Sequence, residues 1–156
     1  MKIRKMLLLI VAASLLIGTV LPFSATAVCE DPQPVFTSEK TQVNDYKTNN
    51  LASYTASFVV NSGIAVISAR YDGYQNVTTG ATITMKLQKK VWFWWSDVDN
   101  DQPNNTWTNV LSGWKNTANH YLALNETGEY RAIITFTVYG TGGPDDFITE
   151  TVYNNY

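Results

Sequence analysis

Four aromatic residues and three aspartates gather in one stretch of the chain, residues 91–105. Exposed indole and phenyl rings can stack against the apolar C–H faces of sugar rings, and they also suit protein contacts or a membrane interface. The stretch reads Val-Trp-Phe-Trp-Trp-Ser-Asp-Val-Asp-Asn-Asp-Gln-Pro-Asn-Asn. The candidate ligand-binding residues are therefore its four rings and one neighbouring indole: Trp92, Phe93, Trp94, Trp95 and Trp107.

The same rings have a structural alternative. On a continuous strand Trp92 and Trp94 would point to one side and the other two rings to the opposite side, so one pair could extend the hydrophobic core. Burial of both pairs at the far end of a hairpin is not expected. A core role with incidental exposure and a genuine binding patch both stay open, and for Trp107 packing in the core is the default.

The acidic half of the stretch raises the question of a metal site. Asp97, Asp99 and Asp101 offer carboxylates at alternating positions, as in the first half of a calcium-binding loop. The second half does not fit, because Gln102 stands where the turn glycine is needed and Thr108 where a bidentate glutamate would complete the shell. A solvated acidic turn is favoured over an ion site, calcium is kept only as a weak possibility, and no other cofactor is expected.

Residues with catalytic potential occur only singly or in a turn. His120 is the only histidine and Cys29 the only cysteine, so neither a Ser-His-Asp triad, a Cys-His dyad nor a histidine-rich zinc site is readily assembled. Asp145 and Asp146 follow Gly-Gly-Pro and indicate the turn before the last strand rather than the carboxylate pair of a glycosidase. We expect no enzyme activity, and a hydrolase is kept as a remote alternative.

The elements that must position these residues are strands. Runs of two-residue hydrophobic periodicity alternate with turn residues, and no amphipathic helix is indicated. The predicted strands are 54–60, 64–71, 82–91, 106–111, 120–124, 128–139 and 147–153. The alternation assigns three sets of side chains to the core: Tyr130, Ala132, Ile134, Phe136 and Val138; Ile83, Met85 and Leu87; Ala65, Ile67, Ala69 and Tyr71.

The longest run carries the strongest indication of fold type. Tyr130 follows the turn at Gly128 and leads the alternating strand, which is how immunoglobulin-like sandwiches tie their sixth strand to the preceding loop. We therefore expect an all-β protein, an antiparallel immunoglobulin-like β-sandwich of about seven strands over residues 51–156.

The first part of the chain predicts export. Residues 1–27 combine a basic start, an apolar run over 7–16 and a small-residue cleavage site at Ala25-Thr-Ala27, the pattern of a signal peptide. Residues 28–50 contain two prolines and little periodicity, which predicts a flexible lead-in. The expected location is secreted or extracellular, with no membrane span after signal cleavage, and with Cys29 free, cross-linked or lipidated.

Charge narrows the class of partner. The whole chain has a formal net charge of −2, from 11 Lys and Arg and 13 Asp and Glu. Signal removal would take three cations and no acid, so the mature charge would be 8 − 13 = −5. A mildly acidic surface offers no electrostatic footprint for nucleic acid or anionic lipid, and neither is expected as the main partner.

Several blocks of the sequence carry a resemblance: Ser-Gly-Ile-Ala-Val-Ile-Ser-Ala-Arg-Tyr-Asp-Gly-Tyr at 62–74, Leu-Gln-Lys-Lys at 87–90, the later Trp107 and Trp114, and Gly-Glu-Tyr-Arg at 128–131. Together they resemble a recurring pattern in small, largely uncharacterised exported proteins of Gram-positive bacteria. The resemblance implies a β-sandwich and export, and it carries no activity or catalytic residues. The chain departs from the pattern at 91–105, where the resemblance implies a short Gly/Ser hairpin.

These expectations lead to one main functional hypothesis and one alternative. The main hypothesis is a secreted, non-catalytic binding module that uses the aromatic and acidic hairpin at 91–105 against a cell-surface or carbohydrate ligand. The alternative is a structural or accessory protein whose exposed rings drive self-association. The oligomeric state is left open by the sequence.

Overall fold

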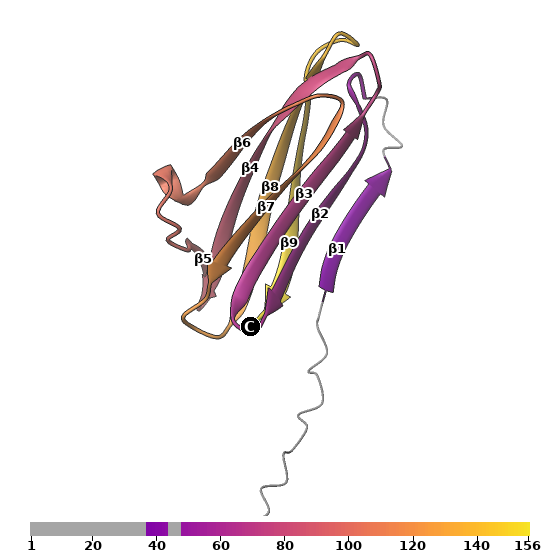
Figure 1. Cartoon of the computed structure of the whole chain (residues 1–156). Helices are drawn as coiled ribbons and strands as arrows, with labels where there is room; N and C mark the ends of the chain where they lie inside the picture. Colours follow the sequence, from indigo (N-terminus) through magenta and orange to yellow (C-terminus); the bar gives the residue numbers. More distant parts are fainter. Residues whose placement is uncertain (1–36, 44–47) are drawn as a thin grey trace, which may run out of the picture. The chain divides into compact units, whose positions relative to one another are not determined.

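The computed structural model describes residues 37–43 and 48–156, where the chain forms nine strands, one short 3-10 helix and no α-helix (Figure 1). All seven predicted strands are present, as β2, β3, β4, β6, β7, β8 and β9, whereas β1 and β5 were not predicted. The elements are β1 (Thr37–Val43), β2 (Leu51–Asn61), β3 (Ile64–Gly73), β4 (Thr78–Val91), β5 (Trp94–Asp97), a 3-10 helix (Pro103–Asn105), β6 (Trp107–Ser112), β7 (Lys115–Ala123), β8 (Glu129–Gly140) and β9 (Asp146–Asn155).

The strands form two antiparallel sheets. Sheet A has the order β1-β2-β3-β7, and sheet B has the order β5-β4-β8-β9. The long strand β4 also pairs with β6 through its first half and with β5 through its last residues. Sheet B therefore has two short strands, β5 and β6, beside one edge of β4. Strand β5 forms a hairpin with the end of β4 (Figure 1).

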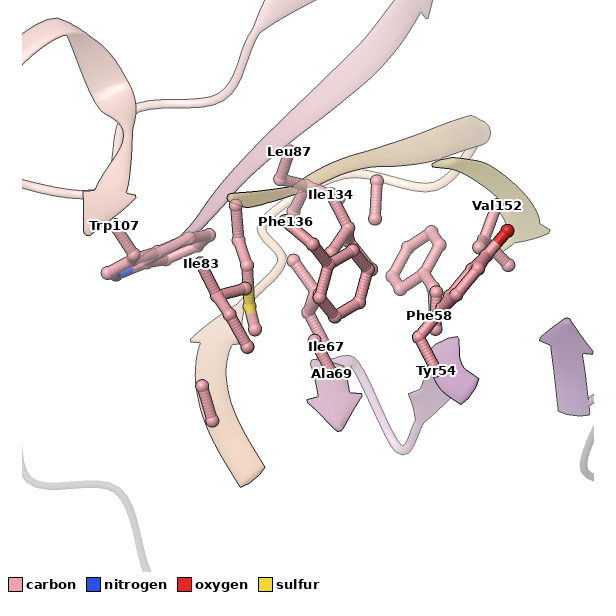
Figure 2. Packing of buried hydrophobic residues seen from close by; sticks show 14 of the residues in the cluster. Tyr54, Phe58, Ile67, Ala69, Ile83, Leu87, Trp107, Ile134, Phe136 and Val152 are labelled. Carbon is pink, nitrogen blue, oxygen red and sulfur yellow. The ribbon is translucent and has the colours of Figure 1, made fainter. Parts of the chain in front are cut away.

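The core lies between the inward faces of the two sheets. All twelve side chains that the alternation assigned to the interior are buried, which confirms the predicted facing of β3, β4 and β8. Figure 2 shows rings of both sheets meeting in this core, and the centroids of Tyr54 on β2 and Phe136 on β8 are 5.3 Å apart. Each large buried side chain contributes roughly 1.5–3 kcal/mol to folding.

The expected flexible lead-in at 28–50 is wrong in part, because β1 lies within it. Every residue of β1 pairs with β2, from Thr37 opposite Val59 to Val43 opposite Ser53. The sequence Thr-Ser-Glu-Lys-Thr-Gln-Val has no hydrophobic alternation, so periodicity could not identify the strand. Backbone pairing at the edge of a sheet needs no such pattern.

The same expectation fails at Asn50, which is fully buried. The Asp146 carboxylate accepts hydrogen bonds from the backbone N–H groups of Asn49, Asn50 and Leu51, at 3.0, 2.7 and 2.9 Å. The Asn50 side chain donates to the Pro144 carbonyl at 3.0 Å and accepts from the Gly142 N–H at 3.2 Å. These hydrogen bonds hold the start of β2 against the turn before β9.

Two sequence expectations fall outside the described ranges. These are the export signal expected at residues 1–27 and the state of Cys29. Across 37–43 and 48–156, no helix has the length and apolar character needed to cross a membrane.

Candidate functional site

The four rings at 92–95 do not lie on one continuous strand, the arrangement on which the alternative of a core pair depended. Val91 at the end of β4 pairs with Trp94 at the start of β5, so Trp92 and Phe93 form a two-residue turn. Trp92 has a φ of +62°, while Phe93 is not in the positive-φ region. A positive φ at the first turn residue alone is the pattern of a type II′ turn, whose first position usually holds glycine.

The turn exposes its rings. The exposed fractions are 85% for Trp92, 82% for Phe93 and 50% for Trp94. Phe93 and Trp94 meet edge to face, with centroids 4.7 Å apart and an interplanar angle of 88°. We call these three residues the aromatic tip. None of the three rings belongs to the hydrophobic core.

Trp95 lies on the other side of the hairpin and belongs to a different surface. Its partner on β4 is Lys90, which lies with Gln88 on the outward face of sheet B. Trp95 therefore lies on that face too. The Trp95 ring is partly exposed. It lies 4.5 Å from the Arg131 guanidinium of β8 and 5.7 Å from the Tyr153 ring of β9, at 59° to that ring. We call Trp95, Arg131 and Tyr153 the Trp95 platform.

A chain of side-chain hydrogen bonds holds the Arg131 side chain of the platform in place. Arg131 Nε donates to Gln88 Oε1 at 2.8 Å, and Gln88 Nε2 donates to Asp97 Oδ1 at 2.7 Å. Lys86 Nζ then donates to Asp97 Oδ2 at 2.9 Å. The bonds from Gln88 and then Lys86 hold the pKa of the Asp97 carboxyl below its usual range. The guanidinium beneath Trp95 is thus fixed against the sheet.

The three aspartates weighed as weak candidate calcium ligands make separate local contacts. Asp97 points onto sheet B, where Lys86 and Gln88 occupy its oxygens. Asp99 Oδ1 instead accepts from the backbone N–H of Asp101 at 3.2 Å, a local turn contact. Among the described residues, no three His, Cys, Asp or Glu side chains are gathered as metal ligands. Asp97 is the last residue of β5 and not the first residue of a loop.

Trp107 is buried and is not part of the exposed aromatic surface, which corrects its place among the candidate binding residues. Its indole stacks on the His120 ring, with centroids 5.0 Å apart and an angle of 15°, and Figure 2 shows it on the side of the core away from Val152. His120 Nε2 also contacts Asn109 Oδ1 at 3.1 Å. Burial lowers the pKa of His120, so the neutral ring is favoured.

An open cavity of about 280 Å³ adjoins the hairpin. Its lining includes Val91 and Val98 from the hairpin side, and Leu124 and Tyr130 from β8 and the segment before it. Lys89 at its wall pairs with Glu126, and this pair raises the pKa of the ammonium and lowers the pKa of the carboxyl. The cavity is partly apolar, and no residue of the aromatic tip or of the Trp95 platform lines it.

Sequence reasoning missed the platform partners Arg131, Tyr153 and Gln88. The outward position of Arg131 follows from its place between the inward Tyr130 and Ala132, but nothing in the predicted strand 147–153 indicated Tyr153 as its neighbour. A turn placed at Trp92 and Phe93 would have put Trp95 on the same outward face as Arg131. That signal was weak, because neither turn residue is a usual hairpin residue.

Comparison of the chain with models of known protein families, with curated proteins and with solved structures finds no match.

Proposed function

We propose that this chain is an exported, non-catalytic binding module with an immunoglobulin-like fold, and that its hairpin β4–β5 binds a carbohydrate or another cell-surface ligand. The aromatic tip supplies the first contact surface. The acidic residues of the stretch serve to order the hairpin and keep it soluble.

The strand order supports the immunoglobulin-like assignment. Sheet A places β2, β3 and β7 side by side, and sheet B places β9, β8 and β4 side by side. This arrangement matches strands A, B, E and G, F, C of an immunoglobulin domain, with the difference that β6 pairs with β4 rather than with β7. The Tyr130 hydroxyl donates to the Glu126 carbonyl at 2.6 Å, the contact of a tyrosine corner.

One observation carries the binding role: the conformation and exposure of Trp92. A bulky residue with positive φ costs of order 1–3 kcal/mol, and the turn gains no ring burial in return because both turn residues are more than four-fifths exposed. Strain at an exposed aromatic turn has no benefit for folding alone. A ligand that covers the rings provides the compensating stabilisation.

Export and partner class rest on sequence features. The signal pattern at 1–27 and the resemblance to exported proteins of Gram-positive bacteria support a secreted location. The mildly acidic charge supports a partner other than nucleic acid or anionic lipid. Stacking of aromatic rings on pyranose faces does not depend on net charge, which favours a carbohydrate.

The test is retention of the mature protein on insoluble cell-wall material and polysaccharides. The variant Trp92→Ser, Phe93→Ser, Trp94→Ser removes the aromatic tip, and Tyr121→Ser removes a ring that is 67% exposed on sheet A as a matched control. We expect retention to fall in the first variant and to persist in the second. Equal retention of wild type and the tip variant would remove the aromatic tip from the binding surface.

Self-association is the second candidate function, because the aromatic tip is the most exposed group of large rings among the described residues. Sedimentation velocity over a range of protein concentrations separates the two. Concentration-dependent assembly that disappears in the tip variant, with no retention on polysaccharide, would favour self-association.

A further inference from the structure

We infer that the Trp95 platform is a separate subsite for a neutral glycan, which rests on the proposed function and names its ligand class. The aromatic tip points away from the body of sheet B, whereas the Trp95 platform lies on its outward face. A sugar chain bound at the platform would lie across β4, β8 and β9 with one pyranose ring against the indole.

The contacts within the platform restrict the motion of the Trp95 indole. Trp95 must lean over β4 to contact Arg131 and Tyr153, which lie on the next two strands of the sheet order. The Arg131 guanidinium is fixed by Gln88, so one face of the indole has a rigid support. A ring that is already ordered loses little rotamer freedom on binding, which favours affinity.

The rings and the polar groups together fit a pyranose. The partly exposed indole offers an apolar surface for the C–H face of a sugar, and Tyr153, tilted by 59°, offers a second surface beside it. Asp97 and Lys86 retain about a third of their side-chain exposure, at 33% and 30%. A carboxylate and an ammonium at the edge of an aromatic surface can accept from and donate to sugar hydroxyls.

Charge balance on this face points to a neutral glycan. Two of its cations are already paired, Lys86 with Asp97 and Lys90 with Glu129. The third, Arg131, is engaged by Gln88 and by the face of the Trp95 indole. The face therefore holds three cations and two carboxylates, and its cations already have partners on the sheet. A uronate or phosphate would compete with Asp97 and Glu129 for the two lysines, whereas a neutral sugar leaves both ion pairs intact.

The control residue for this subsite lies on the same face. Phe147 on β9 is 71% exposed and projects on the same side as Tyr153. The two residues are six positions apart, roughly 20 Å along the strand. Loss of the Phe147 ring removes exposed apolar area from the outer face of sheet B without touching the Trp95 platform.

The experiment is a calorimetric titration of the mature protein with soluble neutral and acidic oligosaccharides. The variants are Trp95→Ala and Tyr153→Ala, with Phe147→Ser as control and Arg131→Met to remove the support beneath the indole. We expect neutral oligosaccharides to bind about tenfold or more weakly to the first two variants and unchanged to the control. Arg131→Met should weaken binding and also alter the near-ultraviolet circular dichroism of Trp95.

The outcomes separate this inference from the proposed function. Neutral-glycan binding that is unchanged in Trp95→Ala and Tyr153→Ala, or a preference for acidic oligosaccharides, would overturn the neutral subsite. If polysaccharide retention is then still lost in the tip variant, the proposed function stands without it. Matching thermal unfolding of wild type and variants excludes loss of fold as the cause.

Discussion

The Tyr130 hydroxyl donates a hydrogen bond of 2.6 Å to the backbone carbonyl of Glu126, four residues earlier. This contact ties the start of β8 to the segment that precedes it. Lys89 lies over the Tyr130 ring, with Nζ 5.9 Å from its centroid, and also pairs with Glu126. The tie therefore links the start of β8 to β4, close to the hairpin that carries the aromatic tip.

Tyr130→Phe should lower the free energy of unfolding by about 0.5–1.5 kcal/mol, because it removes one hydrogen bond and leaves the Glu126 carbonyl without that donor. Urea unfolding followed by circular dichroism measures the change. Tyr121→Phe is the control, since this phenol is exposed on β7, and should stay within about 0.5 kcal/mol of wild type. An unchanged Tyr130→Phe variant would show that the contact does not stabilise the fold.

Asp146→Ala should be among the most damaging polar substitutions, because the carboxylate serves three backbone donors at the start of β2. Hydrogen bonds to a charged acceptor contribute roughly 1.5–3 kcal/mol each, so we expect a loss of at least about 3 kcal/mol. The exposed neighbour in Asp145→Ala should change stability little. Similar midpoints for the two variants in urea would contradict this role of Asp146.

Trp92→Gly should raise the free energy of unfolding by roughly 0.5–1 kcal/mol while weakening ligand binding. Glycine relieves the positive φ of Trp92, worth about 1–3 kcal/mol, against a conformational entropy cost of about 0.5–1 kcal/mol. Phe93→Gly is the matched control, because Phe93 has no positive φ to relieve and the entropy cost remains. Destabilisation by both substitutions would mean that the turn is not strained.

The His120 ring should make stability depend on pH. Its pKa is lowered in the folded protein by burial beside Trp107, so the unfolded chain binds the proton more readily. Stability should therefore fall as pH drops through the unfolded pKa near 6.5 toward the lower folded pKa, and should be retained above it. Urea midpoints between about pH 7.5 and 5.5 test this, and His120→Gln should flatten the profile. A wild-type profile already flat in that window would contradict the account.

The predicted core was right because alternation is a local property that the pleat converts directly into facing. Phe136 and Ile83 occupy opposite positions of paired strands, and their burial follows once each strand is recognised. Trp107 was assigned to the core by default and is found there. These assignments needed no knowledge of which strands are neighbours.

The rest depends on partners that are distant in the chain. Trp95 and Tyr153 lie near each other because the sheet order β5-β4-β8-β9 puts both on one face of sheet B. Nothing local in the sequence specifies that order. Strand β5 was missed because a Trp-Phe turn lacks the glycine or asparagine that usually signals a hairpin. Asn50 was missed because its burial is satisfied by polar partners near Asp146 rather than by a hydrophobic pattern.

The most direct measurement is the response of the five indole N–H signals in a nuclear magnetic resonance spectrum, assigned by substitution, during titration with a cell-wall oligosaccharide that the protein retains. Our account predicts that the signals of Trp92 and Trp94 shift together with one saturation curve and that the signal of Trp95 shifts as its own subsite fills, while the signal of buried Trp107 stays in place. Shifts confined to Trp107 or Trp114, with the three hairpin signals unmoved at saturation, would contradict it.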